Sequence, residues 1–198
     1  MVLKIGITGG IGSGKTIVCR LFKILGVPVF EADAVAKNII NNDPGVRKGL
    51  IYLFGSGIYT PEHVIDRKKL ASIIFNDKYA LQKVNKLVHP KVRNEFTRWV
   101  QQQKARYVLH EAAILFESGF DKLMDQNILV VADKEVRIQR VMARDHISRE
   151  QVLERMSRQW PDERKRKLSD AIIKNNDELL IPQVLRINEN IKKYGKVW

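Results

Sequence analysis

The chain carries Ile5-Gly6-Ile7-Thr8-Gly9-Gly10-Ile11-Gly12-Ser13-Gly14-Lys15-Thr16 near its start, and the other segments are best understood from this stretch outward. Its last eight residues fit G-x-x-x-x-G-K-[ST], the pattern of a phosphate-binding loop, or P-loop. Such a loop wraps backbone N–H groups around phosphate oxygens, so side chains must be absent where the backbone approaches the anion. The stretch therefore predicts a nucleoside triphosphate site.

The residues on either side of the loop supply the strand and the helix that a P-loop needs. Residues 2–7 are apolar enough for a buried strand, and residues 17–25 predict a helix that ends before Gly26. This context argues against a chance glycine-rich turn. Lys15 would sit near the β- and γ-phosphates, and the Thr16 hydroxyl can ligate Mg²⁺. We assign ATP binding in this region to Gly10, Ile11, Gly12, Ser13, Gly14, Lys15, Thr16 and Ile17.

Length and composition predict one compact unit with insertions, since the chain has 198 residues of which 44% are hydrophobic. No window approaches about 20 consecutive apolar residues, so we expect no transmembrane helix and no membrane partner. The first residues form the P-loop strand instead of a secretory signal, which predicts a cytoplasmic protein. The single cysteine, Cys19, is expected to be a reduced core thiol.

The formal net charge of +13 predicts anionic partners, either phosphate-rich small molecules or nucleic acid. Residues 134–167 concentrate this charge, with eleven Lys and Arg against six Asp and Glu. Aromatic residues are not interleaved there apart from Trp160, so we expect no nucleic-acid partner. The oligomeric state stays open between a monomer and a small homo-oligomer.

Apolar runs alternating with helical patterns predict an α/β protein with a parallel sheet. We expect core segments at 1–42, 104–133 and 168–198. Between about 43 and 103 helical periodicity dominates and predicts an inserted helical lobe, with helices near 46–54, 62–76 and 78–103, the last perturbed at His89-Pro90. A lid is expected at about 134–167.

Acidic and amide side chains follow several of the predicted strands. Ligands of open α/β sheets bind beyond the carboxyl ends of the strands, so Asp33, after the second strand, is placed for chemistry, although a helix N-cap is the alternative. Glu111 and Glu117 are candidates for orienting metal-bound water or substrate, or for pairing with a nearby base. Asn175 or Asn176 could hydrogen-bond a nucleobase edge, but asparagine also favours turns.

The lid segment has a pattern of its own. Arg137, Arg140 and Arg144 recur on one side of a helix over about 134–145, and Ser148 to Gln151 has capping-box spacing for a second helix. A hairpin of arginine-bearing helices could close over phosphates and supply cations during transfer. The alternative is a solvated basic face.

In order and spacing, these residues resemble the dephospho-CoA kinase family along the whole chain. The resemblance is carried by residues 6–16, Ala32-Asp33, 65–70, 89–93, 115–119, Arg140 with Arg144-Asp145, Arg158-Gln159 and 170–175. Two departures stand out, because Glu31 occupies a position where the family has Asp, and Ala113 a position where it has Pro.

The resemblance implies a P-loop kinase fold, a three-layer doubly wound sandwich with a five-stranded parallel sheet, a helical acceptor-binding lobe and a mobile helical lid. It implies transfer of a phosphoryl group from Mg-ATP to the ribose 3′-hydroxyl of dephospho-CoA, which gives coenzyme A and ADP.

The resemblance also implies roles for particular residues. Asp33 would be the catalytic carboxylate, acting with Lys15 and Arg140, and Asn175 would lie near adenine. Arg140 would reach the ATP phosphates from the lid. The acceptor site would be lined by Thr8, Asp33, His89, Arg93 and Glu117.

A P-loop is also compatible with three other functions. The nearest is another small-molecule P-loop kinase, for a nucleoside monophosphate or a small metabolite. A GTP-dependent switch is disfavoured because the sequence has no D-x-x-G or N-K-x-D run. A nucleic-acid-binding ATPase is disfavoured because the basic residues cluster where a kinase needs them.

Overall fold

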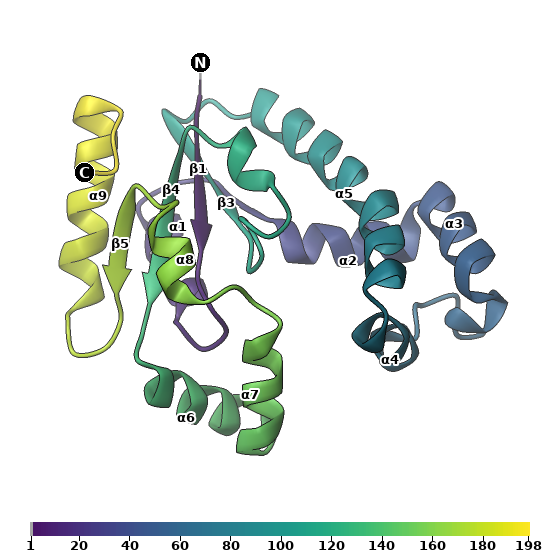
Figure 1. Cartoon of the computed structure of the whole chain (residues 1–198). Helices are drawn as coiled ribbons and strands as arrows, with labels where there is room; N and C mark the ends of the chain where they lie inside the picture. Colours follow the sequence, from purple (N-terminus) through teal and green to yellow (C-terminus); the bar gives the residue numbers. More distant parts are fainter. Residues whose placement is uncertain (1) are drawn as a thin grey trace. The chain divides into compact units, whose positions relative to one another are not determined.

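The structure is a computed structural model that describes residues 2–198, apart from the side chains of Phe75 and Asn76. The chain divides into two compact units (Figure 1). The sheet unit comprises the chain up to Glu31 and the residues from Gln103 to Trp198. The helical unit runs from Ala32 to Gln102, so it begins one helix earlier than the lobe expected at about 43–103.

A five-stranded parallel sheet forms the centre of the sheet unit, in the order β2-β3-β1-β4-β5, which confirms the predicted fold class (Figure 1). The P-loop strand β1 is the middle strand, with Ile7 beside Glu111 of β3 and Thr8 beside Leu129 of β4. The strands are β1 (Leu3–Thr8), β2 (Val29–Glu31), β3 (Tyr107–Glu111), β4 (Gln126–Val131) and β5 (Ala171–Lys174). Glu111 is the last residue of β3.

One face of this sheet is covered by α1 and α9, whose buried side chains share a core with alternate residues of the strands. Phe22 of α1 and Ile187 of α9 belong to this core, together with Ile5 and Ile7 of β1. The segment after β3 covers the other face, where a Cβ at Gly6 would collide with Leu115. Both faces are therefore buried, which explains the continuous apolar runs. The helices of the unit are α1 (Lys15–Ile24), η2 (Phe120–Leu123), α6 (Lys134–Asp145), α7 (Arg149–Ser157), α8 (Asp162–Arg166) and α9 (Leu180–Tyr194).

The segment expected to be a lid consists of α6, α7 and α8. Ser148 and Gln151 form the predicted capping box at the start of α7. Ile138, Val141 and Val152 make a small apolar cluster between α6 and α7, and Ile11 of the P-loop packs against it. This cluster gives the two helices a common core.

The helical unit contains α2 (Ala32–Asn42), α3 (Pro44–Phe54), η1 (Ser56–Ile58), α4 (Arg67–Asn76) and α5 (Lys78–Gln101). The helix expected from 62 begins at Arg67, because Asp66 caps it by accepting a hydrogen bond from the Lys69 N–H. Helix α5 continues through Pro90, so the helix expected over 78–103 is one continuous element. Its apolar face is buried at every fourth residue from Ala80 to Phe96, and this packing outweighs one lost backbone hydrogen bond.

Within residues 2–198, none of the helices has both the length and the apolar character needed to cross a membrane.

Candidate active site

The P-loop has the backbone geometry of an anion site. Gly12 and Gly14 have φ values of +80° and +88°, a left-handed conformation that side chains strongly disfavour. Gly14 is also the N-cap of α1, and no side chain caps that helix. The Lys15 and Thr16 N–H groups at the start of α1 are therefore left for an anion, and the positive end of the helix dipole favours one there. The Ile17 N–H is used, since it donates to the Gly14 carbonyl at 2.9 Å.

Helix α6 lies directly against this loop. A Cβ at Gly10 would lie 2.1 Å from Arg137 Nη2, and a Cβ at Gly12 would lie 2.6 Å from the Arg137 carbonyl oxygen. The contact at Gly12 is with backbone, so this position needs glycine for the close approach of α6. The contact at Gly10 is with the end of the Arg137 side chain, which would have to shift if Gly10 carried a Cβ. The loop and the base of the lid are thus one packed structure.

Lys15 contacts an acid in this structure. Its Nζ lies 2.5 Å from Glu111 Oε1, and the two side chains are only 11% and 12% exposed. Glu111 ends β3 beside β1, so the parallel register brings it to the loop. Of the alternatives left open by the sequence, the structure shows the one in which Glu111 pairs with a nearby base. Cys19 of α1 is a buried free thiol that interacts with both side chains of this pair. Burial raises the pKa of Cys19 well above its usual range.

Arg140 presents a free donor beside the loop. Its Nη1 is buried and has no hydrogen-bond partner within the described part of the chain, and it lies 4.0 Å from an ideal Cβ position at Gly14. Arg137 is occupied instead, because its Nε donates to the Ile11 carbonyl and its Nη1 to Asp162. Arg144 pairs with Asp145. Of the three arginines expected on one lid face, Arg140 is the one with a buried donor left for a ligand.

The asparagines at the end of β5 both bind backbone groups. Asn175 donates from Nδ2 to the Ser13 carbonyl at 2.8 Å, and Asn176 Oδ1 accepts from the Asp133 N–H at 2.7 Å. Asn175 thus fastens the P-loop to β5. Asp133 is the N-cap residue of α6 but makes no side-chain capping hydrogen bond there.

The segment after β3, which contains Ala113 and Glu117, is held by contacts from β1 and from the region of α8. Thr8 Oγ1 donates to the Ala113 carbonyl at 3.4 Å. Glu117 Oε1 accepts from the Trp160 N–H at 2.9 Å and lies 3.0 Å from Lys165 Nζ, whose side chain is completely buried. A buried ammonium group requires a counter-charge, and Glu117 supplies it. No local sequence pattern indicated this pair, because Lys165 lies in a basic run that is typical of a solvated face.

Three expected site residues belong to the helical unit. Asp33 is an exposed residue in the first turn of α2, two positions beyond the end of β2. It is not the N-cap, because the helix already begins at Ala32. His89 and Arg93 are one turn apart on α5, and burial, with a smaller effect of the Arg93 charge, lowers the pKa of His89. Within this unit, His89 and Arg93 therefore share one helix face.

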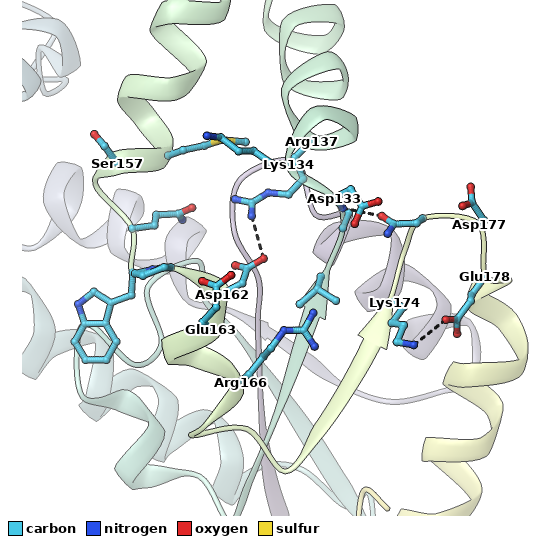
Figure 2. Close-up of a pocket in the computed structure, with 17 residues that line it drawn as sticks. Asp133, Lys134, Arg137, Ser157, Asp162, Glu163, Arg166, Lys174, Asp177 and Glu178 are labelled. Carbon is cyan, nitrogen blue, oxygen red and sulfur yellow. Dashed lines mark hydrogen bonds and ion pairs between the residues drawn. The ribbon is translucent and has the colours of Figure 1, made fainter.

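A cavity of about 1030 Å³ is lined by Arg137 together with residues from the start of α6, from α8 and from the loop before α9 (Figure 2). Its lining includes no residue of the P-loop. The Arg137–Asp162 and Lys174–Glu178 ion pairs shown in Figure 2 leave no clear excess of one charge in it. We assign no ligand to this cavity.

The strand order, the P-loop after the central strand and the arginine-bearing helices packed on it define a P-loop kinase. Shikimate kinase from Acinetobacter baumannii has the same fold, with a TM-score of 0.55 at 17% identity over 98% of this chain and 96% of that one. A crystal structure from Thermus thermophilus matches far better, with a TM-score of 0.84 and 34% identity over 96% of both chains.

The family model for dephospho-CoA kinase matches residues 3–180. A dephospho-CoA kinase of Porphyromonas gingivalis is 39% identical over 96% of this chain and 95% of its own length. The dephospho-CoA kinase structure from Campylobacter jejuni has a TM-score of 0.72 and 27% identity over 98% of this chain and 100% of that one. The chain belongs to the dephospho-CoA kinase family.

Proposed function

We propose that the protein transfers the γ-phosphoryl group of ATP to the ribose 3′-hydroxyl of dephospho-CoA, giving coenzyme A and ADP, the last step of coenzyme A synthesis. Membership of the family along almost the whole chain supports this acceptor. The observation that carries the kinase reaction is the buried, unpartnered Nη1 of Arg140 beside Gly14, at the uncapped start of α1.

ATP binding follows from the loop and its surroundings. Residues 10–17 would surround the β- and γ-phosphates, with the Gly12 and Gly14 amides facing them, and Lys15 would leave Glu111 to contact them. The Ile11 N–H would not take part, because it donates to Gln159. The Nη1 of Arg140 would donate a hydrogen bond to a phosphate oxygen and stabilise the negative charge on the phosphates during transfer. Asn175 would act near adenine while its amide holds Ser13.

We infer that the reaction uses Mg²⁺, held by the Thr16 hydroxyl. Thr16 is an exposed residue of the first turn of α1, next to Lys15, so its hydroxyl is accessible to a metal. The described residues contain no cluster of three or more acidic, His or Cys side chains that could hold a metal by themselves. This fits Mg²⁺, which keeps water and substrate phosphates as its main ligands. When bound, the ion would neutralise charge on the phosphates.

For the acceptor, we propose Asp33 as the catalytic carboxylate. Phosphoryl transfer requires mainly alignment and charge neutralisation, so Asp33 would orient the 3′-hydroxyl and accept its proton. His89 and Arg93 would bind the acceptor from α5. Thr8, whose hydroxyl donates to the Ala113 carbonyl, would also line the acceptor site. Glu117 would contribute to the acceptor site indirectly, by fixing the segment after β3, because its Oε1 already contacts the Trp160 N–H and Lys165.

ATP and dephospho-CoA are the partners implied by the family. A cytoplasmic location, the absence of a nucleic-acid partner and a monomer or small homo-oligomer stay predictions.

The test is ADP release by the purified protein with Mg-ATP, using dephospho-CoA, AMP, other nucleoside monophosphates or no acceptor. We expect turnover with dephospho-CoA alone and formation of coenzyme A. Phosphorylation of a different acceptor would overturn the substrate assignment and support another small-molecule P-loop kinase.

A further inference from the structure

Two side chains from opposite ends of the lid segment hold one residue of the P-loop. The Ile11 N–H donates to Gln159 Oε1 at 2.8 Å, and the Ile11 carbonyl accepts from Arg137 Nε at 2.9 Å. Arg137 lies near the start of α6, and Gln159 lies between α7 and α8. The side chain of Ile11 also packs against the apolar cluster between α6 and α7. Both hydrogen-bonding groups of Ile11 are therefore fixed by the lid segment.

Each of the two holding side chains is itself held. Arg137 Nη1 lies 3.0 Å from Asp162 at the start of α8, and these side chains are 11% and 17% exposed. Gln159 Nε2 donates to the Ala113 carbonyl at 3.4 Å. The next residue, Trp160, donates its N–H to Glu117, which pairs with the buried Lys165. Gln159 and Arg137 are thus held in place by other residues of the sheet unit, and this fixes the positions from which they bind Ile11.

Holding Ile11 has a consequence for the anion site, because a peptide group is planar and trans. The Ile11 carbonyl and the Gly12 N–H belong to one peptide group and point in opposite directions. With the carbonyl fixed towards Arg137, the Gly12 N–H points to the other side of the loop backbone. Asn175 fixes the Ser13 carbonyl in the same way and thereby orients the Gly14 N–H.

We propose that Gln159 is a positioning residue for the ATP phosphates, which acts with Arg137 by fixing the two peptide groups on either side of the Ile11 Cα, so that the loop amides are oriented before ATP arrives. Neither side chain has to touch ATP. The inference rests on the ATP use in the proposed function and does not depend on the identity of the acceptor. It also means that the two ends of the lid segment stay with the P-loop, so any closure involves the residues between them.

The test uses two variants at these positions and a matched control. Gln159→Met keeps the length of the side chain and removes the acceptor for the Ile11 N–H. Arg137→Lys keeps the positive charge and removes the Nε donor. Gln139→Met changes an exposed glutamine of α6 and serves as the control. Binding of ADP and of tripolyphosphate is measured by calorimetry, the KM values for ATP and dephospho-CoA by kinetics, and the melting temperature by circular dichroism.

We expect Gln159→Met and Arg137→Lys each to weaken ADP and tripolyphosphate binding about tenfold, the effect of one lost hydrogen bond that leaves a partner unsatisfied. The control should stay within about twofold. Because both side chains hold the same residue, through the two peptide groups on either side of it, the double variant should lose clearly less than the product of the two single effects.

Three results would overturn the proposal. Unchanged ADP and tripolyphosphate affinities with a lowered melting temperature would show a purely structural role. A raised KM for dephospho-CoA with an unchanged KM for ATP would show that Gln159 acts through Ala113. Fully multiplicative effects in the double variant would show that the two residues act separately. If Gln159→Met does not fold, Arg137→Lys decides by the same binding assay. Failure of the wild-type protein to form coenzyme A would instead overturn the proposed function, since the binding assays need no acceptor.

Discussion

Lys15 Nζ lies 2.5 Å from Glu111 Oε1, so the lysine expected at the ATP phosphates is paired with a carboxylate from the neighbouring strand. The pair is nearly buried. In the proposed function Lys15 leaves Glu111 to contact a phosphate, and part of the free energy of nucleotide binding would then be used to separate this pair.

Replacing Glu111 with Gln should tighten the binding of metal-free ADP about fivefold, a gain of about 1 kcal/mol, since Lys15 no longer gives up an ion pair whose attraction is largely offset by its desolvation. Calorimetry in the presence of a chelator measures this without any effect of Glu111 near a metal. Glu31→Gln, which breaks the exposed Lys23–Glu31 pair on the adjacent strand, is the control and should leave ADP binding unchanged. Weaker ADP binding by Glu111→Gln would contradict the prediction.

Replacing Asp33 with Asn should lower kcat by about 100-fold or more while ADP binding stays near normal, because the carboxylate acts on the acceptor hydroxyl. Stopped-time assays of coenzyme A formation and ADP calorimetry measure the two properties separately. Asp177→Asn, at another exposed aspartate, should retain turnover. Full activity of Asp33→Asn would remove this residue from the mechanism.

Replacing Arg140 with Met should weaken ATP binding by about tenfold to 100-fold, as expected for the loss of a hydrogen bond between a guanidinium group and a phosphate. The matched control is Arg144→Met, because Arg144 lies one turn further along α6 and is paired with Asp145. Titration with ADP and the KM for ATP report the difference. Equal effects of the two variants would mean that Arg140 contributes only general positive charge.

Replacing Lys165 with Met should lower the free energy of unfolding by about 3–5 kcal/mol, because the Glu117 carboxylate then stays in a mostly buried site without its counter-charge. Adding Glu117→Gln removes that charge and keeps an acceptor for the Trp160 N–H. The double variant should therefore be more stable than Lys165→Met alone in urea unfolding. A double variant that is less stable would show that the two residues contribute independently.

Stability should fall with acid because of His110, which lies buried between the rings of Phe30 and Phe120. Burial lowers the pKa of His110 from 6.5 to about 4. Between these values the unfolded chain binds a proton that the folded chain excludes, so stability is full above pH 6.5 and decreases as the pH falls towards 4. The loss from this residue is about 3 kcal/mol.

His110→Phe should remove this part of the pH dependence, measured as the slope of urea unfolding free energy between pH 7 and pH 5. His146→Asn changes an exposed histidine at the end of α6, in a left-handed conformation that asparagine tolerates, and should keep the wild-type slope. An unchanged slope in His110→Phe would show that other groups cause the acid sensitivity.

Local sequence patterns were sufficient for the backbone of most segments. The glycine spacing of residues 9–14 predicted the loop, the apolar runs predicted the parallel strands, and the capping box predicted the start of α7 at Arg149. These features depend on residues close together in the chain. The boundary of the helical unit at Ala32 was not predicted, because a helix pattern does not say against which elements the helix packs.

The partners of the polar side chains depended on the tertiary structure. Lys15 and Glu111 are 96 residues apart, and Ile11 and Gln159 are 148 apart. Strand order and the packing of α6 and α8 bring them together. The sequence by itself determined the P-loop and the class of fold, because backbone conformation and burial periodicity are local. Only the tertiary structure decided which charged groups are paired and that Arg140, within the described part of the chain, keeps a buried donor without a hydrogen-bond partner, because desolvation and long-range contacts are set by the whole fold.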